Sequence, residues 1–199
     1  LAISCNNIKI INAILDFFGE KISSEKKLLD EAANETLNLI SEVGKKGFVS
    51  TNSFIPVFER IVKIKGIDLN FSGSKYTFLS YACTINEIEI VKMLLENDNI
   101  DVNTYSFSNG NTPLITAINN QNVEIAELLI KDERTNINSI NYDNNTALTI
   151  SVHKKLTNII DLLIHNKKFD PELSLLNLAF YESSGKIAIQ LSSCKLLDV

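Results

Sequence analysis

The sequence predicts an all-α protein in which pairs of helices stack into one elongated solenoid. The first observation is a repeat: three related segments begin 35 (112 − 77) and 34 (146 − 112) residues apart, at residues 77–82, 112–117 and 146–151. The second is a fixed internal spacing. A small residue ends each segment, and an isoleucine of the next amphipathic run follows it by 8 residues (90 − 82, 125 − 117, 159 − 151). One helix pair cannot bury all of its apolar surface, so the pairs must pack on copies of themselves.

The first helix of each unit is predicted to begin after a threonine. A threonine hydroxyl can accept a hydrogen bond from a backbone N–H that has no partner at a helix start, and the candidates are Thr77, Thr112 and Thr146. Pro113 fits the first helical position, where its missing N–H costs little. The apolar face starts at Leu79, Leu114 and Leu148, and close approach of neighbouring helices is expected at Ala82, Ala117 and Ser151.

The second helix of each unit is predicted within residues 88–95, 123–130 and 157–164. Each of these runs has a broad apolar stripe, which suits burial on more than one side. Short pieces rich in Asp and Asn follow at residues 100–103, 136–138 and 168–170. Each piece begins the connection to the next repeat. We expect these connections to form short β-turn or hairpin fingers.

Weaker copies extend the pattern toward both ends of the chain. Residues 1–15 align with 81–95, and residues 54–70 align with 87–103 at an offset of 33 (87 − 54). We expect a single domain of about six repeats over residues 1–199. Its predicted parts are a truncated repeat (1–25), an irregular repeat with an insertion (26–70), three clear repeats (71–103, 104–138 and 139–170) and a C-terminal repeat (171–199). The partial first unit suggests that the chain is cut from a longer polypeptide.

The unit resembles the ankyrin repeat, which has a T-P-L-H-x-A helix start and a period of about 33 residues. The closest copy is Thr112-Pro-Leu-Ile-Thr-Ala117, whereas Phe78 and Ala147 replace the proline of the pattern. The glycine that precedes the threonine is present as Gly110. Asn144 takes this place in the next unit, and asparagine is the non-glycine residue that best tolerates positive φ. The resemblance implies an ankyrin-type solenoid that binds another protein.

Composition excludes several other classes of function. A net charge of −5 argues against the clustered basic residues of a nucleic-acid interface, and no stretch approaches the roughly 18 uncharged apolar residues of a membrane span. Three widely spaced cysteines (Cys5, Cys83 and Cys194) fit a reducing compartment. We expect a cytoplasmic monomer that contacts neither nucleic acid nor membrane.

Candidates for catalysis are few in this sequence. His165 follows a second-helix stripe, where a cation complements the helix dipole, and His153 is interpreted as a surface contact rather than a general base. Cys83 lies beside the small residue of its helix and is interpreted as a packed small hydrophobe. No glycine-rich phosphate motif and no cysteine pair with metal-ligand spacing occurs. We therefore expect no catalytic residue, no metal and no cofactor.

The resemblance to ankyrin repeats implies that a protein or peptide partner contacts the turn tips and the groove side of the first helices. The tips are expected at residues 71–74, 105–108 and 140–143. The expected partner-binding residues are Tyr76, Ile85, Tyr105, Phe107, Asn111, Asn119, Asn120, Tyr142, His153, Lys154, Tyr181 and Glu182. Aromatic side chains are the most frequent interface anchors. The alternative is that some of the apolar tip side chains fold back onto the neighbouring turn and cover apolar surface there; the candidates are Phe71, Tyr105, Phe107, Ile140 and Tyr142.

Two other functions are weighed against partner binding. One is a regulatory or spacer region of a larger enzyme, adaptor or channel protein, which the flanking sequence would identify. The other is an enzyme in its own right, which would require a deep pocket with paired titratable groups.

Overall fold

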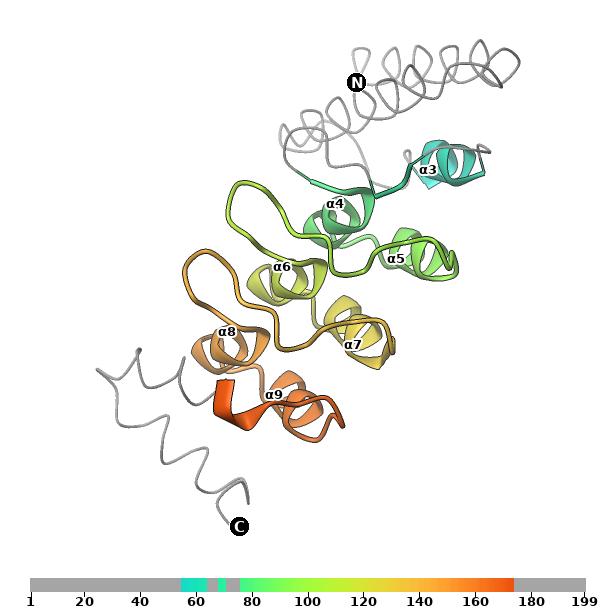
Figure 1. The fold of residues 1–199 in the computed structure, drawn as a ribbon. Coiled ribbons are helices and arrows are strands. Elements are labelled where there is room, and N and C mark those ends of the chain that lie inside the picture. Colours follow the sequence, from blue (N-terminus) through green and yellow to red (C-terminus); the bar gives the residue numbers. More distant parts are fainter. Residues whose placement is uncertain (1–54, 64–67, 71–75, 174–199) are drawn as a thin grey trace, which may run out of the picture.

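The computed structural model describes residues 55–63, 68–70 and 76–173. Within these ranges the chain forms the helices α3 (Ile55–Val62), α4 (Phe78–Ile85), α5 (Ile88–Leu95), α6 (Pro113–Asn119), α7 (Val123–Lys131), α8 (Ala147–His153) and α9 (Thr157–Ile164). Residues 171–173 are also helical. Figure 1 shows the labelled helices in two rows, with α4, α6 and α8 in one row and α3, α5, α7 and α9 in the other. The all-α helix-pair architecture is confirmed. The predicted parts at residues 1–54 and 174–199 lie outside the described residues.

The first helices begin at the predicted threonines. The hydroxyl oxygens of Thr77, Thr112 and Thr146 each accept a hydrogen bond from the backbone N–H three residues later, at 3.1, 3.3 and 3.1 Å. Pro113 occupies the start of α6, as the sequence predicts. A side-chain cap of this kind stabilises a helix by about 1 kcal/mol, so each repeat carries its own helix start signal.

The core runs along the stack between the two rows. The three leucines of the first helices are buried, and the small residues three positions later are fully buried: Ala82, Ala117 and Ser151. These small side chains lie in the helices that pack as α4 on α6 and α6 on α8. The Ser151 hydroxyl donates to the Ala147 carbonyl at 2.7 Å, so this serine is buried without losing its hydrogen bond.

The second helices have the predicted bounds, apart from one added residue at the end of α7. The agreement extends to the weak copy at residues 54–70, which contains α3. The bounds of α3 (Ile55–Val62) differ from those of α5 (Ile88–Leu95) by the predicted 33 residues at both ends (88 − 55, 95 − 62). α3 packs on α5, α5 on α7, and α7 on α9. The helix that precedes residue 71 therefore belongs to the same row as the clear copies.

Each first helix ends in a left-handed residue that sequence reasoning did not predict. Asn86, Gln121 and Lys155 have φ values of 60°, 59° and 57°, and each lies 9 residues after the capping threonine (86 − 77, 121 − 112, 155 − 146). In each case the following N–H bonds back to the helix, as from Leu156 to the Ser151 carbonyl at 2.9 Å. This is the hydrogen bond of a Schellman turn, which normally favours glycine at the left-handed position.

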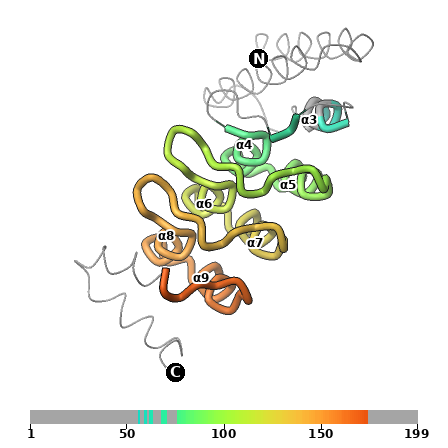
Figure 2. The backbone as a smooth tube through the Cα atoms, in the orientation of Figure 1, coloured from blue at the N-terminus to red at the C-terminus, as the bar shows by residue number. Residues whose placement is uncertain are grey.

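In the part of the chain that the structure describes, two fingers connect the repeats, at residues 104–112 and 139–146. Their turns are closed by backbone hydrogen bonds from Ser106 to Asn111 at 2.9 Å and from Asn141 to Asn145 at 3.0 Å. In the described chain they are turns rather than strands, with an isolated β-bridge between Ile140 and Thr146. Figure 2 shows the two loops running side by side next to α6 and α8. The predicted finger at residues 71–74 lies outside the described residues.

Candidate functional site

The two fingers expose three aromatic side chains. Tyr105, Phe107 and Tyr142 are 50%, 60% and 60% exposed, and Ile140 beside them is 41% exposed. In the part of the chain that the structure describes, these four residues are the exposed large hydrophobic side chains. We call Tyr105, Phe107 and Tyr142 the finger cluster. It combines one aromatic pair on the first finger with one ring on the second.

The rings of the finger cluster contact one another edge to face. The Tyr105 ring centroid lies 6.2 Å from that of Phe107, with an interplanar angle of 77°, and 6.3 Å from that of Tyr142, with an angle of 68°. This geometry suits aromatic quadrupoles, because the positive edge of one ring points toward the negative face of the next. The Tyr105 and Tyr142 rings thus contact each other across the two fingers and remain half-exposed, and their contact with a partner stays a prediction.

Gly110 fixes the position of the Tyr142 ring. Gly110 has a φ of 71°, and a Cβ atom there would lie 2.6 Å from Cδ1 of Tyr142. The tyrosine ring therefore lies directly on the glycine backbone, and no other residue would leave this space. The equivalent Asn144 also has positive φ (58°), as the sequence predicts.

A polar joint beneath the finger cluster links the two fingers. The Tyr142 N–H donates to the Asn109 carbonyl at 3.1 Å, and the Asn141 side-chain amide donates to the Asn111 side-chain oxygen at 2.8 Å. Asn111 is only 8% exposed, so its side chain is not on the groove surface where it was expected. It is buried because its amide oxygen accepts this hydrogen bond from the next repeat.

The remaining expected contact residues lie along the first helices with differing exposure. Asn120 and His153 are exposed, while Asn119 and Lys154 are half-buried. Tyr76 and Ile85 are also half-buried and pack against the core, with the Tyr76 ring centroid 6.4 Å from that of Tyr81. Tyr181 and Glu182 lie outside the described residues. The structure thus brings together the finger residues and spreads the others along the stack.

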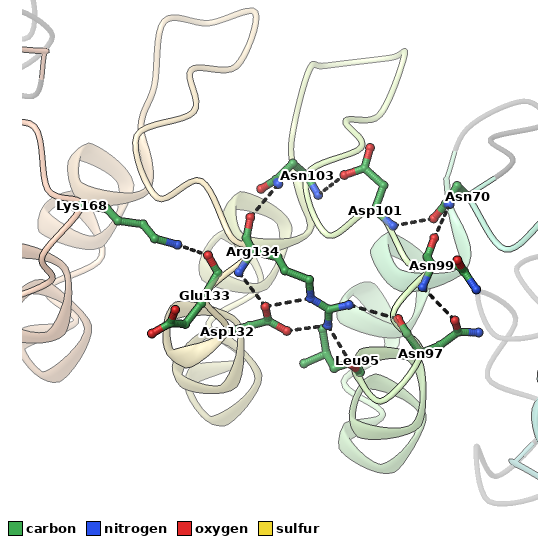
Figure 3. Close-up of polar contacts among 10 residues, drawn as sticks. All are labelled: Asn70, Leu95, Asn97, Asn99, Asp101, Asn103, Asp132, Glu133, Arg134 and Lys168. Atoms are coloured by element: carbon green, nitrogen blue, oxygen red, sulfur yellow. Dashed lines mark hydrogen bonds and ion pairs between the residues drawn. The ribbon is translucent and has the colours of Figure 1, made fainter.

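At the base of the fingers, asparagines join each repeat to the next through the backbone. The Asn103 side chain donates to the Arg134 carbonyl at 2.9 Å and accepts from the Asn136 N–H at 2.7 Å. The same pair of bonds runs from Asn70 to residues 99 and 101 (2.8 and 2.7 Å) and from Asn138 to residues 168 and 170 (2.6 and 3.1 Å). Figure 3 shows the Asn70 and Asn103 members of this series, which we call the asparagine ladder. Its 33- and 35-residue spacing (103 − 70, 138 − 103) is visible in the sequence, but its bonding is not.

Two cationic side chains donate hydrogen bonds to backbone carbonyls of the preceding repeat, at or just after the end of its second helix. The Arg134 guanidinium donates to the Leu95 and Asn97 carbonyls at 2.7 and 3.0 Å, where cations complement the helix dipole. Asp132 orients it from the other side at 2.7 and 3.0 Å, and this hydrogen-bonded pair lowers the pKa of the Asp132 carboxyl. Lys168, 34 residues after Arg134 (168 − 134), donates to the Glu133 and Thr135 carbonyls. The charged side chains of Asp132, Arg134 and Lys168 therefore make contacts within the stack (Figure 3).

The described residues offer little that resembles a catalytic centre. A shallow depression of about 540 Å³ lies between the ends of α7 and α9, but its Lys167 and Lys168 are engaged with Glu133. His165 at the end of α9 lies 2.8 Å from the Asp161 carbonyl. Burial raises the pKa of the Cys83 thiol, which is fully buried in α4, so the prediction that Cys83 is a packed small hydrophobe is confirmed. Among the described side chains, no group of three His, Cys, Asp or Glu residues is placed to hold a metal.

The comparisons with known proteins concern the repeat itself. A family model of ankyrin repeats (3 copies) matches residues 32–141 and 103–175, which together span well over half of the chain. No curated protein matches the sequence. Within the described ranges, none of the helices combines the length and apolar character that crossing a membrane requires.

Proposed function

Because this chain belongs to the ankyrin-repeat family, we propose that it is a non-catalytic module that binds a partner protein through its fingers and concave groove. Repeats of this family are generally protein–protein interaction modules. The observation that carries the proposal is the finger cluster, since the described chain concentrates its exposed large hydrophobic side chains on the two fingers. Tyrosine and phenylalanine bury a large apolar area at low entropy cost, as interface anchors do.

The rigidity of the fingers supports this proposal. Gly110 holds the Tyr142 ring, and the joint from Asn141 to Asn111 fixes one finger on the other. A surface that is ordered before binding loses little conformational entropy when a partner docks. The fingers also contain no Lys or Arg in residues 104–112 and 139–146, which favours a protein partner over nucleic acid.

The proposal also covers localisation and oligomeric state. We propose that the module is cytoplasmic and monomeric. The free Cys83 thiol is consistent with a reducing compartment, and size-exclusion chromatography with light scattering measures the oligomeric state.

Affinity purification from the native cell tests partner binding. The bait is the chain itself, compared with the variant Tyr105→Ala/Tyr142→Ala and with the control Lys92→Ala/Lys131→Ala, which removes exposed cations from α5 and α7. Removing two anchors from an interface typically weakens binding by at least about thirtyfold, so the specific partner is lost with the tyrosine variant and kept with the control. Circular dichroism checks that both variants remain folded. An unchanged set of recovered proteins would show that the finger cluster is not the binding surface.

A further inference from the structure

We propose that the finger cluster receives an arginine side chain of the partner protein. This inference rests on the proposed function, because it names the chemistry of the group that docks on the same surface. It is argued from the orientation of the three rings and from the charges of the two fingers.

The ring orientation leaves aromatic faces open to a cation. Tyr105 contacts Phe107 and Tyr142 through near-perpendicular pairs, so the rings do not cover one another by stacking. The face of an aromatic ring carries negative potential, and it attracts a cation placed within about 6 Å of the centroid. Since the neighbouring centroids are 6.2 and 6.3 Å apart, one cation can lie near two rings at once.

The charges around the cluster favour a positive group on the partner. Residues 104–112 and 139–146 contain Asp143 as their charged residue and neither Lys nor Arg. The cations described above lie elsewhere, at the ends of the second helices, where they bind carbonyls of the stack. The fingers therefore present electron-rich rings without a cation of their own, in a chain of net charge −5.

Arginine fits this surface better than lysine does. A guanidinium is planar, stacks on aromatic faces and is less strongly hydrated than an ammonium group. A guanidinium also has five N–H donors, and the first finger carries an oxygen acceptor in the exposed Ser108, whose hydroxyl lies 2.9 Å from that of Ser106. A purely apolar occupant, such as a proline-rich segment, would gain from the ring area but would leave the electrostatics of the ring faces unused.

A matched set of peptides tests the inference on the full chain. The probe is the peptide Gly-Ser-Gly-Arg-Gly-Ser-Gly, compared with peptides that carry citrulline, lysine or proline in place of arginine. Citrulline keeps the shape of arginine and removes its charge. Titrations are followed by the aromatic proton and carbon resonances of the three rings. We expect the arginine peptide to shift these resonances and to bind about tenfold more tightly than the citrulline peptide.

Two variants separate ring chemistry from apolar area. Tyr142→Leu keeps an apolar side chain and removes the ring, so it should abolish the preference for arginine over citrulline. Tyr142→Phe keeps the ring face and should retain this preference. If Tyr142→Leu does not fold, as judged by circular dichroism, the Tyr105→Leu variant gives the same comparison.

The outcomes also distinguish this inference from the proposed function. Equal binding of the arginine and citrulline peptides, or tighter binding of the proline peptide, would overturn the arginine assignment. If the native partner is nevertheless lost with Tyr105→Ala/Tyr142→Ala, the fingers still bind a protein and only the arginine assignment fails. If partner recovery is unchanged as well, both proposals fail.

Discussion

Three residues at the ends of the first helices adopt a conformation that their side chains disfavour. Asn86, Gln121 and Lys155 all have φ near 60°, where a Cβ atom crowds the following carbonyl and costs about 1–2 kcal/mol. Asparagine tolerates this region best, so the cost is concentrated at Gln121 and Lys155. The sequence does not reveal these positions, because three different residue types occupy them and none is glycine.

Glycine at such a position should stabilise the protein. We expect Lys155→Gly to raise the free energy of unfolding by about 1 kcal/mol, since the relief of the left-handed strain exceeds the added freedom of the unfolded chain. Urea unfolding followed by circular dichroism measures the change. The matched control is Lys154→Gly, because Lys154 has a right-handed conformation (φ −86°) and its replacement should destabilise. Equal losses for both variants would contradict this explanation.

At the scale of elements, the asparagine ladder stabilises the contact between successive repeats. Each asparagine replaces two hydrogen bonds to water by two bonds to the next loop. Each side-chain amide bonds to two successive peptide units of the next loop, because it donates to the carbonyl of one residue and accepts from the N–H two residues later (99 and 101, 134 and 136, 168 and 170). The ladder thus fixes the register of each loop on its neighbour.

Removing one member of the ladder should weaken the stack. We expect Asn103→Ala to lower the free energy of unfolding by about 1–2 kcal/mol, because it leaves the Asn136 N–H and the Arg134 carbonyl without these partners. Asn99→Ala is the control, since Asn99 bonds to the side chains of Asn70 and Asn97 through its backbone, and a change of at most about 0.5 kcal/mol is expected. The two variants are compared by urea denaturation. A loss for Asn103→Ala no larger than that for Asn99→Ala would show that water replaces the ladder bonds without cost.

The elements themselves were predictable, whereas their joints were not. The starts of α4, α6 and α8, the bounds of α5, α7 and α9 to within one residue, and α3 by alignment follow from threonine caps and apolar spacing, which act within about ten residues along the chain. The bonds of Asn103 and Asn111 join residues 30 to 33 positions apart, so they depend on the register between repeats. Hence Asn111 was expected on the groove and is instead buried in the joint between the fingers.

At the scale of the whole molecule, charge is distributed unequally between the two rows of described helices. The first helices α4 and α6 carry no charged side chain, while α5 and α7 carry Lys and Glu and α9 carries Asp161. The fingers belong to the uncharged side (Figure 1). The helices beside the fingers therefore contribute little charge, whereas the second helices α5 and α7 carry charges of both signs.

The packing of the stack should protect its buried thiol. Cys83 lies in α4, its carbonyl accepts a hydrogen bond from the Asn122 side chain of the next repeat at 2.7 Å, and burial raises the pKa of its thiol. In the background Cys5→Ser/Cys194→Ser, we expect Cys83 to react with a disulfide reagent at pH 8 at least about a hundredfold more slowly than in the urea-unfolded chain. Absorbance of the released thiolate measures both rates. A native rate close to the unfolded rate would show that neighbouring repeats separate readily.

The Cys83 thiol also determines the sign of one contribution to the pH dependence of the free energy of unfolding. Because the folded-state pKa of Cys83 is raised above its ordinary value of 9.0, its contribution to stability is present below pH 9. That contribution is lost as the pH rises further, because the unfolded chain alone releases the proton. The Cys83→Ala variant should therefore lose less stability between pH 9 and pH 10 than the parent chain.

The asparagine ladder has a consequence for how such a chain can change over generations. Its amides recognise peptide groups and not side chains, so the residues that receive them can differ, as Asn99, Arg134 and Lys168 do. A repeat that keeps its own asparagine can therefore form the ladder bonds with any following repeat whose loop has the same backbone course. The ladder thus places no requirement on the side chains of that loop, so its hydrogen bonds survive duplication or reordering of repeats while the finger residues diversify.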